Sequence, residues 1–136
     1  ARMAQRPEVL VVGSAVGFYG DRGDEVLDET SSAGTDFLGD VARDWEAAAQ
    51  PAIEAGIRVV FARTGIVLNP AGGALGKMLL PFQAGVGGKL GNGRQWMSWI
   101  SREDWIGAVY HALQTPTVRG PVNLTAPEPV TAATFA

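Results

Sequence analysis

The sequence contains no cysteine and only one histidine, His111. Without cysteine the chain forms no disulfide bond and carries out no thiolate chemistry, which is compatible with a cytoplasmic location. A structural transition-metal site uses several histidine, cysteine or carboxylate ligands at short spacing. With one histidine and no dense carboxylate cluster, the sequence predicts no metal site.

Basic residues are not in excess, since 11 Lys and Arg stand against 14 Asp and Glu, for a net charge of -3. Proteins that bind nucleic acid through its phosphates usually carry a basic excess, so we expect no nucleic-acid partner. The chain has no run of eighteen apolar residues and does not open with a signal-peptide pattern. We therefore expect no membrane partner either.

What the chain does have is the composition of a small globular domain. Its 136 residues are 46% hydrophobic and 18% charged, enough apolar content for one core. Its 18 glycines gather mainly in residues 13–23 and 65–93. Long glycine-rich connections more often carry function than not.

The first candidate for function follows an apolar run near the start of the chain. Residues 9–12 (VLVV) lead into Gly13 and a glycine-rich turn over 13–20. An apolar run without alternation predicts a strand buried on both faces, as in the centre of a parallel sheet. Ligands of such sheets bind beyond the carboxyl ends of the strands.

Further along, the pattern alternates between helices and strands. A loop over 14–35 precedes a helix over 37–55, which Thr35 or Asp36 can cap and Pro51 should kink. Its stripe of Phe37, Val41, Trp45 and Ala48 or Ala49 should face the core. A strand over 57–62 completes a βαβ unit. We then expect a loop over 63–70 and a helix over 74–82 that ends near Pro81. After these we expect a strand over 96–100 and a helix capped by Ser101. The last expected elements are a strand over 122–124 and a helix from Thr131.

Two glycine patterns resemble phosphate-binding motifs. Gly13, Gly17 and Gly20 could form a dinucleotide fingerprint, but no amphipathic helix follows directly, so a later strand end of such a sheet is favoured. Residues 72–77 (GGALGK) are not a P-loop, because the first glycine and the final Ser or Thr are missing. Lys77 is then a solvated helix residue or a contact to an anionic ligand.

Three further sites have a functional and a structural interpretation. Ser14, at a strand end, is either a turn residue or a hydrogen-bonding partner of a reacting oxygen, and no histidine neighbours it to make it a nucleophile. Tyr19 is either a packing residue or an acid. Residues 91–99 (GNGRQWMSW) combine glycines, a cation and two indoles. They form either a surface turn over core tryptophans or a site in which Arg94 binds phosphate.

Four segments, in order along the chain, resemble segments of the extended short-chain dehydrogenases/reductases. The resemblance is to their atypical, NAD(P)-binding, sugar-epimerase-like subgroup, and it covers nearly the whole chain. The segments are 14–21 (SAVGFYGD), 63–70 (RTGIVLNP), 91–104 (GNGRQWMSWISRED) and 120–131 (GPVNLTAPEPVT).

The resemblance implies an α/β fold with a Rossmann-like parallel sheet in truncated form. Members of the family open with a glycine-rich βαβ unit that binds the pyrophosphate of the cofactor, and this chain corresponds to the carboxyl-side portion. Residues 1–136 would then be a single partial NAD(P)-binding domain, with 71–100 contributing substrate-region elements. The implied cofactor is NADP or NAD, bound weakly or not at all by this chain alone. An isolated portion would expose apolar surface, so it would be a fragment or need a partner, and a homo-oligomer is one such arrangement.

The resemblance also implies site residues. Ser14 would polarise an oxygen of a small-molecule substrate, and Tyr19 is the nearby phenol that could act as an acid. The cofactor would lie against Gly13, Ser14, Ala15, Thr64, Gly65, Ile66 and Val67. The substrate would lie against Lys77, Arg94, Gln95 and Trp96.

One departure from the family leaves the activity open. Typical members carry a Tyr-x-x-x-Lys pair on the helix after the long loop, and here Phe37 and Val41 stand in those places. Neither side chain can transfer a proton. The family's usual arginine is also shifted, since Met97 stands near its place and Arg94 three residues earlier. The chain is then either an epimerase/dehydratase-like oxidoreductase acting on a nucleotide-sugar or another small carbonyl or hydroxyl compound, or a cofactor-binding sensor or interaction module without turnover.

Overall fold

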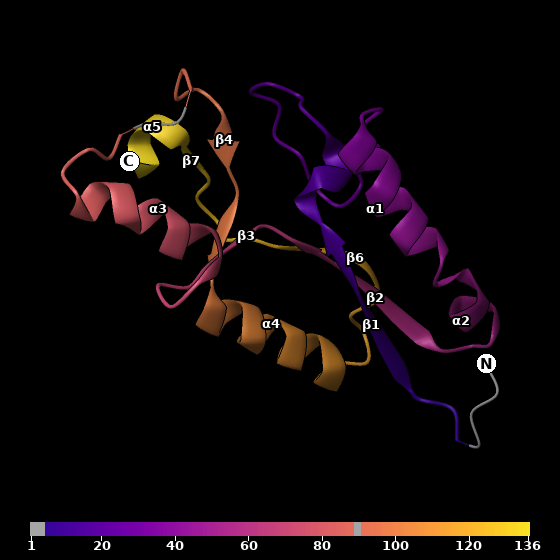
Figure 1. The fold of residues 1–136 in the computed structure, drawn as a ribbon. Coiled ribbons are helices and arrows are strands. Elements are labelled where there is room, and N and C mark those ends of the chain that lie inside the picture. Colours follow the sequence, from indigo (N-terminus) through magenta and orange to yellow (C-terminus); the bar gives the residue numbers. More distant parts are fainter. Residues whose placement is uncertain (1–4, 89–90) are drawn as a thin grey trace. The chain divides into compact units, whose positions relative to one another are not determined.

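A computed structural model describes residues 5–88 and 91–136. These form two compact units (Figure 1). The first comprises Ala1–Thr64 and Gly107–Leu124, and the second Gly65–Ile106 and Thr125–Ala136. Helices accompany strands in both, which confirms the predicted α/β class.

The sheet of the first unit has three parallel strands in the order β1-β2-β6. They are β1 (Val9–Ala15), β2 (Arg58–Thr64) and β6 (Gly120–Leu124). The expected central place of the first strand is wrong for this sheet, because β1 pairs only with β2 among the described residues and most of its residues are only half-buried. The central strand is β2, where Val59, Val60 and Ala62 are buried.

The long crossover of the βαβ unit contains a 3-10 turn and two helices. These are η1 (Val16–Tyr19), α1 (Phe37–Ala47) and α2 (Gln50–Glu54). Asp36 caps α1 as predicted, because its Oδ1 accepts a hydrogen bond from the amide of Gly39 at 2.8 Å. The helix breaks just before Pro51, also as predicted.

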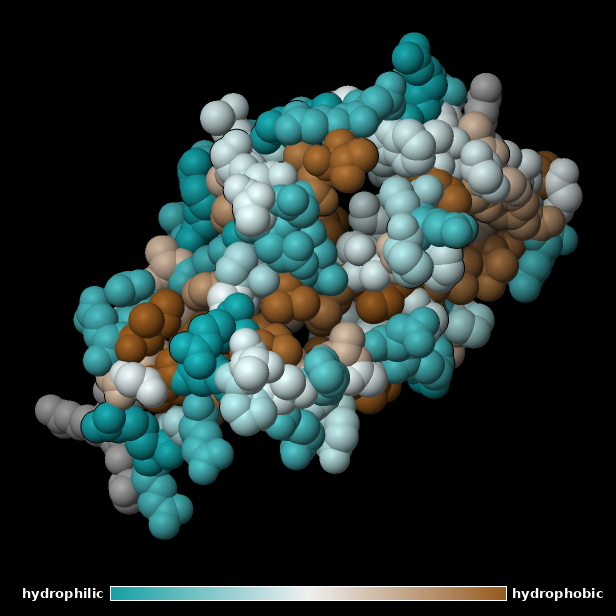
Figure 2. Space-filling model, turned by 180° about the vertical axis from the view of Figure 1, so that it is seen from behind, coloured by the Kyte–Doolittle hydropathy of each residue, from teal (hydrophilic) through white to brown (hydrophobic). Residues whose placement is uncertain are grey.

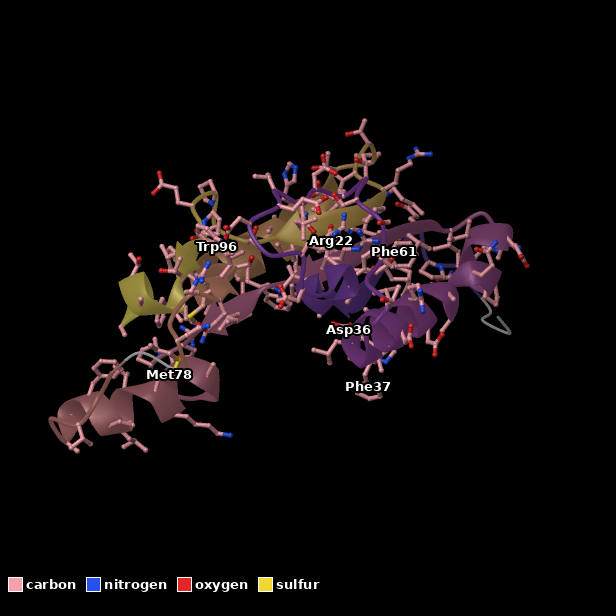
Figure 3. The ribbon with its side chains drawn as sticks, turned by 90° about the horizontal axis from the view of Figure 1, so that it is seen from above. Arg22, Asp36, Phe37, Phe61, Met78 and Trp96 are labelled. Atoms are coloured by element: carbon pink, nitrogen blue, oxygen red, sulfur yellow. The ribbon has the colours of Figure 1, made fainter. Side chains whose placement is uncertain are left out.

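The predicted apolar stripe of α1 is wrong in its direction. Phe37 is 77% exposed and Trp45 53%, whereas Gly39 and Ala42 are buried. Figure 3 shows Phe37 directed away from the sheet. Gly39 packs against the backbone of Gly34, where an added Cβ would lie 2.7 Å from the carbonyl oxygen. Small residues therefore occupy the buried face of the helix, and the large apolar side chains are left on the outer face.

The connection from η1 to α1, residues 20–36, returns to η1 before the helix begins. The amide of Gly34 donates to the carbonyl of Phe18 at 2.8 Å. A Cβ on Gly34 would lie 2.7 Å from the Cα of Gly20, so this close approach requires glycine. Within the loop Arg22, labelled in Figure 3, forms an ion pair with Glu25 at 2.7 Å. The loop is thus held by its own contacts.

The second unit contains short strands and helices. Its elements are β3 (Ile66–Leu68), α3 (Gly73–Gln83), β4 (Trp96–Met97), β5 (Trp99–Ser101), β7 (Val130–Thr131) and α5 (Ala132–Phe135). The strands form a parallel pair β3-β5 and an antiparallel pair β4-β7. Residues 66–68 were expected as loop and are a strand. Pro81 lies inside α3, which ends two residues later.

Helix α4 (Arg102–Gln114) begins where the sequence predicts. Ser101 Oγ accepts from the amide of Asp104 at 2.9 Å, the expected cap. At the other end Arg58, from β2, donates to the carbonyl oxygens of Ala112 and Leu113 at 2.8 and 3.0 Å. A cation at a helix C-terminus satisfies the last carbonyl groups, so this contact ties α4 to the sheet.

Many large apolar side chains are not buried. Figure 2 shows apolar residues at the surface among hydrophilic ones on the face it presents. Exposed examples in the first unit are Leu10, Phe37, Leu38, Trp45, Ile53, Tyr110 and Leu113. The expectation that an isolated portion of the family fold exposes apolar surface is therefore met by this chain.

Candidate functional site

Three polar residues stand in one row across the carboxyl ends of the parallel strands. Ser14 of β1 is in register with Arg63 of β2, and Arg63 is in register with Asn123 of β6. Residues in register on neighbouring strands point to the same face of a sheet. The fold therefore gathers these side chains on one face, at the edge where ligands of such sheets bind.

Arg63 is held by a carboxylate from α1. Its Nε and Nη2 donate to Oε1 and Oε2 of Glu46, both at 2.9 Å. The side chains of Arg63 and Glu46 are only 4% and 13% exposed. Two parallel hydrogen bonds match the planar guanidinium to the carboxylate, the strongest geometry for such a pair. The pair joins the central strand to the last turn of α1.

Ser14 joins the same carboxylate. Its Oγ donates to Oε1 of Glu46 at 2.8 Å, and the residue is 6% exposed. A hydroxyl has one donor, so once it is used on Glu46 only the lone pairs of Oγ remain for another partner. In this structure Ser14 can therefore accept a hydrogen bond from a third group but cannot donate one.

Tyr19 extends the set toward β6. Its hydroxyl donates to Oδ1 of Asn123 at 2.6 Å and accepts from Nη1 of Arg63 at 3.1 Å. The residue is 3% exposed. The guanidinium of Arg63 also lies 3.4 Å from the centre of the Phe18 ring, a cation-π contact. We call Ser14, Tyr19, Glu46, Arg63 and Asn123 the strand-end network.

Arg63 keeps its positive charge although its side chain is buried. Burial alone would lower the pKa of the guanidinium, but the hydrogen bonds to Glu46 and to Tyr19 outweigh it and the pKa is raised above its ordinary value. Arg63 is therefore a permanent cation, and the carboxylate of Glu46 is its partner.

The long loop reaches the same edge. Oε1 of Glu29 accepts a hydrogen bond from the amide of Asn123 at 2.8 Å. β6 is the last strand of its sheet, so its outer backbone groups need partners from elsewhere. Glu29 supplies one, and the loop thereby crosses from the end of β1 to β6.

The predicted cofactor residues occupy different environments. Gly13 is exposed, and a Cβ placed on it would meet no atom within 4 Å. Ala15 ends β1 in register with Thr64 of β2. Ile66 and Val67 belong to β3 and pair with Trp99 and Ile100.

Backbone packing requires glycine at position 65. A Cβ there would lie 2.3 Å from the carbonyl oxygen of Ser98, and that oxygen accepts from the amide of Ile66 at 2.7 Å. The glycine is thus required for the close approach of two backbone segments, with or without a ligand.

The predicted substrate residues all lie in the second unit, on α3, in the turn before β4 and on β4. Lys77 is exposed on α3. Arg94 is exposed in the turn before β4, where its amide donates to Oδ1 of Asn92 at 2.9 Å. The carbonyl of Gln95 accepts from Ala132, and Trp96, labelled in Figure 3, is 48% exposed on β4.

Sequence reasoning missed three of the five network residues, Glu46, Arg63 and Asn123. A signal was available for Arg63, because it directly follows a largely apolar run and lies next to the end of its strand, just as Ser14 does. Polar residues at the ends of successive parallel strands converge at one edge. Glu46 and Asn123 carry no comparable local signal.

Within residues 5–88 and 91–136, no three His, Asp or Glu side chains are grouped as metal ligands. No helix in these same ranges is long and apolar enough to cross a lipid bilayer.

Comparison with known proteins identifies relatives that share both sequence and fold. The epimerase family protein Mb2239 of Mycobacterium bovis is 55% identical over 126 residues, which is 93% of this chain and 42% of the relative. The human epimerase family protein SDR39U1, solved with NADPH, is 39% identical with a TM-score of 0.92 and covers 99% of this chain and 46% of its own.

A second solved structure agrees. The nucleoside-diphosphate sugar epimerase of Corynebacterium glutamicum is 46% identical with a TM-score of 0.89, over 94% of this chain and 28% of that one. No family model matches the chain. The predicted resemblance and the Rossmann-like fold are confirmed. In sequence and fold the chain is similar to these epimerase family proteins, and it spans 42% of the length of the Mycobacterium bovis relative.

Proposed function

We propose that the chain forms the carboxyl-side part of an NAD(P)-dependent, epimerase/dehydratase-like oxidoreductase. Its substrate would be a nucleotide-sugar or another small molecule with a carbonyl or hydroxyl group. The observation that carries this proposal is the row of Ser14, Arg63 and Asn123 at the carboxyl ends of three parallel strands. This edge is the ligand-binding edge of open α/β sheets.

The residues at this edge fit a cofactor in part. Side chains alternate along a strand, so Gly13 and Ala15 point to the face opposite Ser14. There the open space around Gly13 allows a flat ring or a phosphate to approach the backbone. Ser14 itself is buried and bound to Glu46. We therefore assign cofactor contact to Gly13, Ala15 and Thr64, and expect Ser14 to contribute less.

Bound NAD(P) would supply the hydride acceptor and donor of an oxidoreductase. The chain's own contribution would be to hold that edge rigid and to present polar atoms to the substrate. Ser14 would reach a substrate oxygen only after giving up its hydrogen bond to Glu46. Tyr19 would act as an acid only after breaking its hydrogen bond to Asn123. For the second unit taken by itself, substrate contact by Arg94, Gln95, Trp96 and Lys77 stays a prediction.

A second candidate is a cofactor-binding protein without turnover. The observation that favours it is that the hydroxyls of Ser14 and Tyr19 both donate to partners inside the protein. In addition Phe37, which stands where the family's proton-transferring tyrosine is expected, is 77% exposed and carries no ionisable group.

The two candidates are separated by hydride transfer in a protein that contains this chain at the full length of its relatives. NADPH oxidation would be followed with a panel of carbonyl substrates, for the natural sequence and for Ser14→Ala. Ser32→Ala, in the exposed loop, is the matched control. Turnover that falls in kcat for Ser14→Ala, with an unchanged Kd for NADPH, supports the oxidoreductase. Tight NADPH binding with no turnover on any substrate supports the second candidate.

A further inference from the structure

A concave pocket of about 480 Å³ lies in the first unit, toward the amino ends of β2 and β6. Its volume falls within the range of small-molecule sites. The lining comes from α2, from β2 and from the residues at the start of β6. It includes neither Ser14 nor any other member of the strand-end network, so it is separate from the site described above.

The floor of this pocket is apolar. Val59 is buried, while Phe61, labelled on β2 in Figure 3, is half-buried. Ile53 of α2 forms a wall and is 42% exposed. The ring of Phe61 and the side chain of Ile53 remain in contact with water, so they gain free energy when an apolar body covers them.

The rim carries positive charge. Arg119 lines the pocket, and within the part of the chain that the structure describes its guanidinium has no hydrogen-bond or ion-pair partner. Arg58 also lines it, but three of its five N–H donors, both on Nη1 and one on Nη2, are used on the carbonyls of Ala112, Leu113 and Val118. Arg58 therefore adds positive charge, while Arg119 is the donor available to a ligand.

We propose that this pocket binds a small amphiphilic anion, an apolar body that carries one carboxylate. The apolar body would cover Val59, Phe61 and Ile53, and the carboxylate would accept from Arg119. Apolar walls with a few polar groups at defined places are the usual make-up of small-ligand sites. The unpartnered arginine selects an anion over a neutral or cationic molecule of the same shape.

Calorimetric titration of the 136-residue chain with sodium decanoate tests the proposal, with decanol and decyltrimethylammonium as the uncharged and cationic probes. We expect saturable one-site binding of decanoate only. Arg119→Gln should weaken it about tenfold, the worth of one charge-assisted hydrogen bond. Ile53→Gln should weaken it as well. Arg43→Gln, an exposed arginine on α1 away from the pocket, is the matched control and should bind as the natural sequence does.

Three results would overturn the proposal. They are the absence of saturable binding, equal binding of all three probes, and an Arg119→Gln variant that binds decanoate unchanged. The same titration on a protein with the full length of the relatives gives a fourth, since loss of binding there would mean that this surface is an internal contact and not a ligand site. The outcome is independent of whether the carboxyl-end site performs hydride transfer.

Discussion

Glu46 receives two hydrogen bonds from Arg63, each 2.9 Å long, across 17 residues of sequence. The same carboxylate accepts the hydroxyl of Ser14 at 2.8 Å. One side chain of α1 thus fixes the carboxyl ends of two neighbouring strands. The rigidity of the proposed ligand edge depends on this contact.

Removing Arg63 should be strongly destabilising. Arg63→Met leaves the carboxylate of Glu46 buried without its cation, which costs about 3–5 kcal/mol of unfolding free energy. Arg63→Lys should recover only part of this, because an ammonium group cannot form both parallel bonds or stack on Phe18 in the same way. Urea unfolding followed by circular dichroism measures both values. Equal stability of the lysine variant and the natural sequence would show that the paired geometry is unimportant.

Tyr19→Phe removes one hydroxyl that serves two neighbours. Oδ1 of Asn123, which is half-buried, loses its donor, and Nη1 of the buried Arg63 loses its acceptor. Leaving buried polar groups unpaired costs about 1–3 kcal/mol. Tyr110→Phe, 65% exposed on α4, is the matched control and should change the unfolding free energy little. A Tyr19→Phe variant as stable as its control would contradict the network.

Gly65→Ala should disrupt the second unit without any ligand being present. The added Cβ would lie 2.3 Å from the carbonyl oxygen of Ser98, a backbone atom that cannot move aside cheaply. Hydrogen exchange should then show faster opening at the Ile66 amide, which donates to that same oxygen. Gly13→Ala, whose Cβ would meet no atom within 4 Å, is the control and should leave exchange unchanged.

At acidic pH, protonation of Asp28 should destabilise the loop between η1 and α1. The hydroxyl and amide of Thr30 donate to Oδ1 of Asp28 at 2.6 and 2.9 Å and lower the pKa of its carboxyl. Because the pKa is lower in the folded state, the carboxylate stabilises the folded loop fully at a pH above its ordinary, unfolded-state pKa. This stabilisation is lost as the pH falls through the pKa of the folded state. Exchange at the Thr30 amide should rise over that acidic window. Asp28→Asn keeps an acceptor oxygen but does not titrate, so its loop should lack this pH dependence.

Local signals in the sequence predicted the elements well. The cap at Asp36, the break before Pro51 and the cap at Ser101 each depend on a few adjacent residues, and each is present. The apolar run over 9–12 predicted a strand correctly. Its central position was wrong, because the place of a strand in a sheet depends on which other strands pair with it, and in this sheet β2 takes the centre.

The network could not be predicted in the same way. Tyr19 and Asn123 meet across 104 residues, and Glu46 reaches Arg63 from the face of α1 on which the small residues Gly39 and Ala42 are buried. The predicted stripe of Phe37 and Trp45 would have placed a different face inward. Strand register and helix rotation decide such contacts, and neither is encoded by a short motif.

The measurement that tests the central proposal most directly is the Kd of NADPH, obtained by calorimetry on two proteins. One is this 136-residue chain, and the other contains it at the full length of the epimerase family relatives. We predict saturable binding, with a Kd in the micromolar range or below, for the longer protein and weak or no binding for the chain alone. Failure of the longer protein to bind either NADPH or NADH would contradict the proposed NAD(P)-dependent function. Micromolar binding by the 136 residues alone would contradict the prediction that part of the cofactor site is supplied by residues outside this chain.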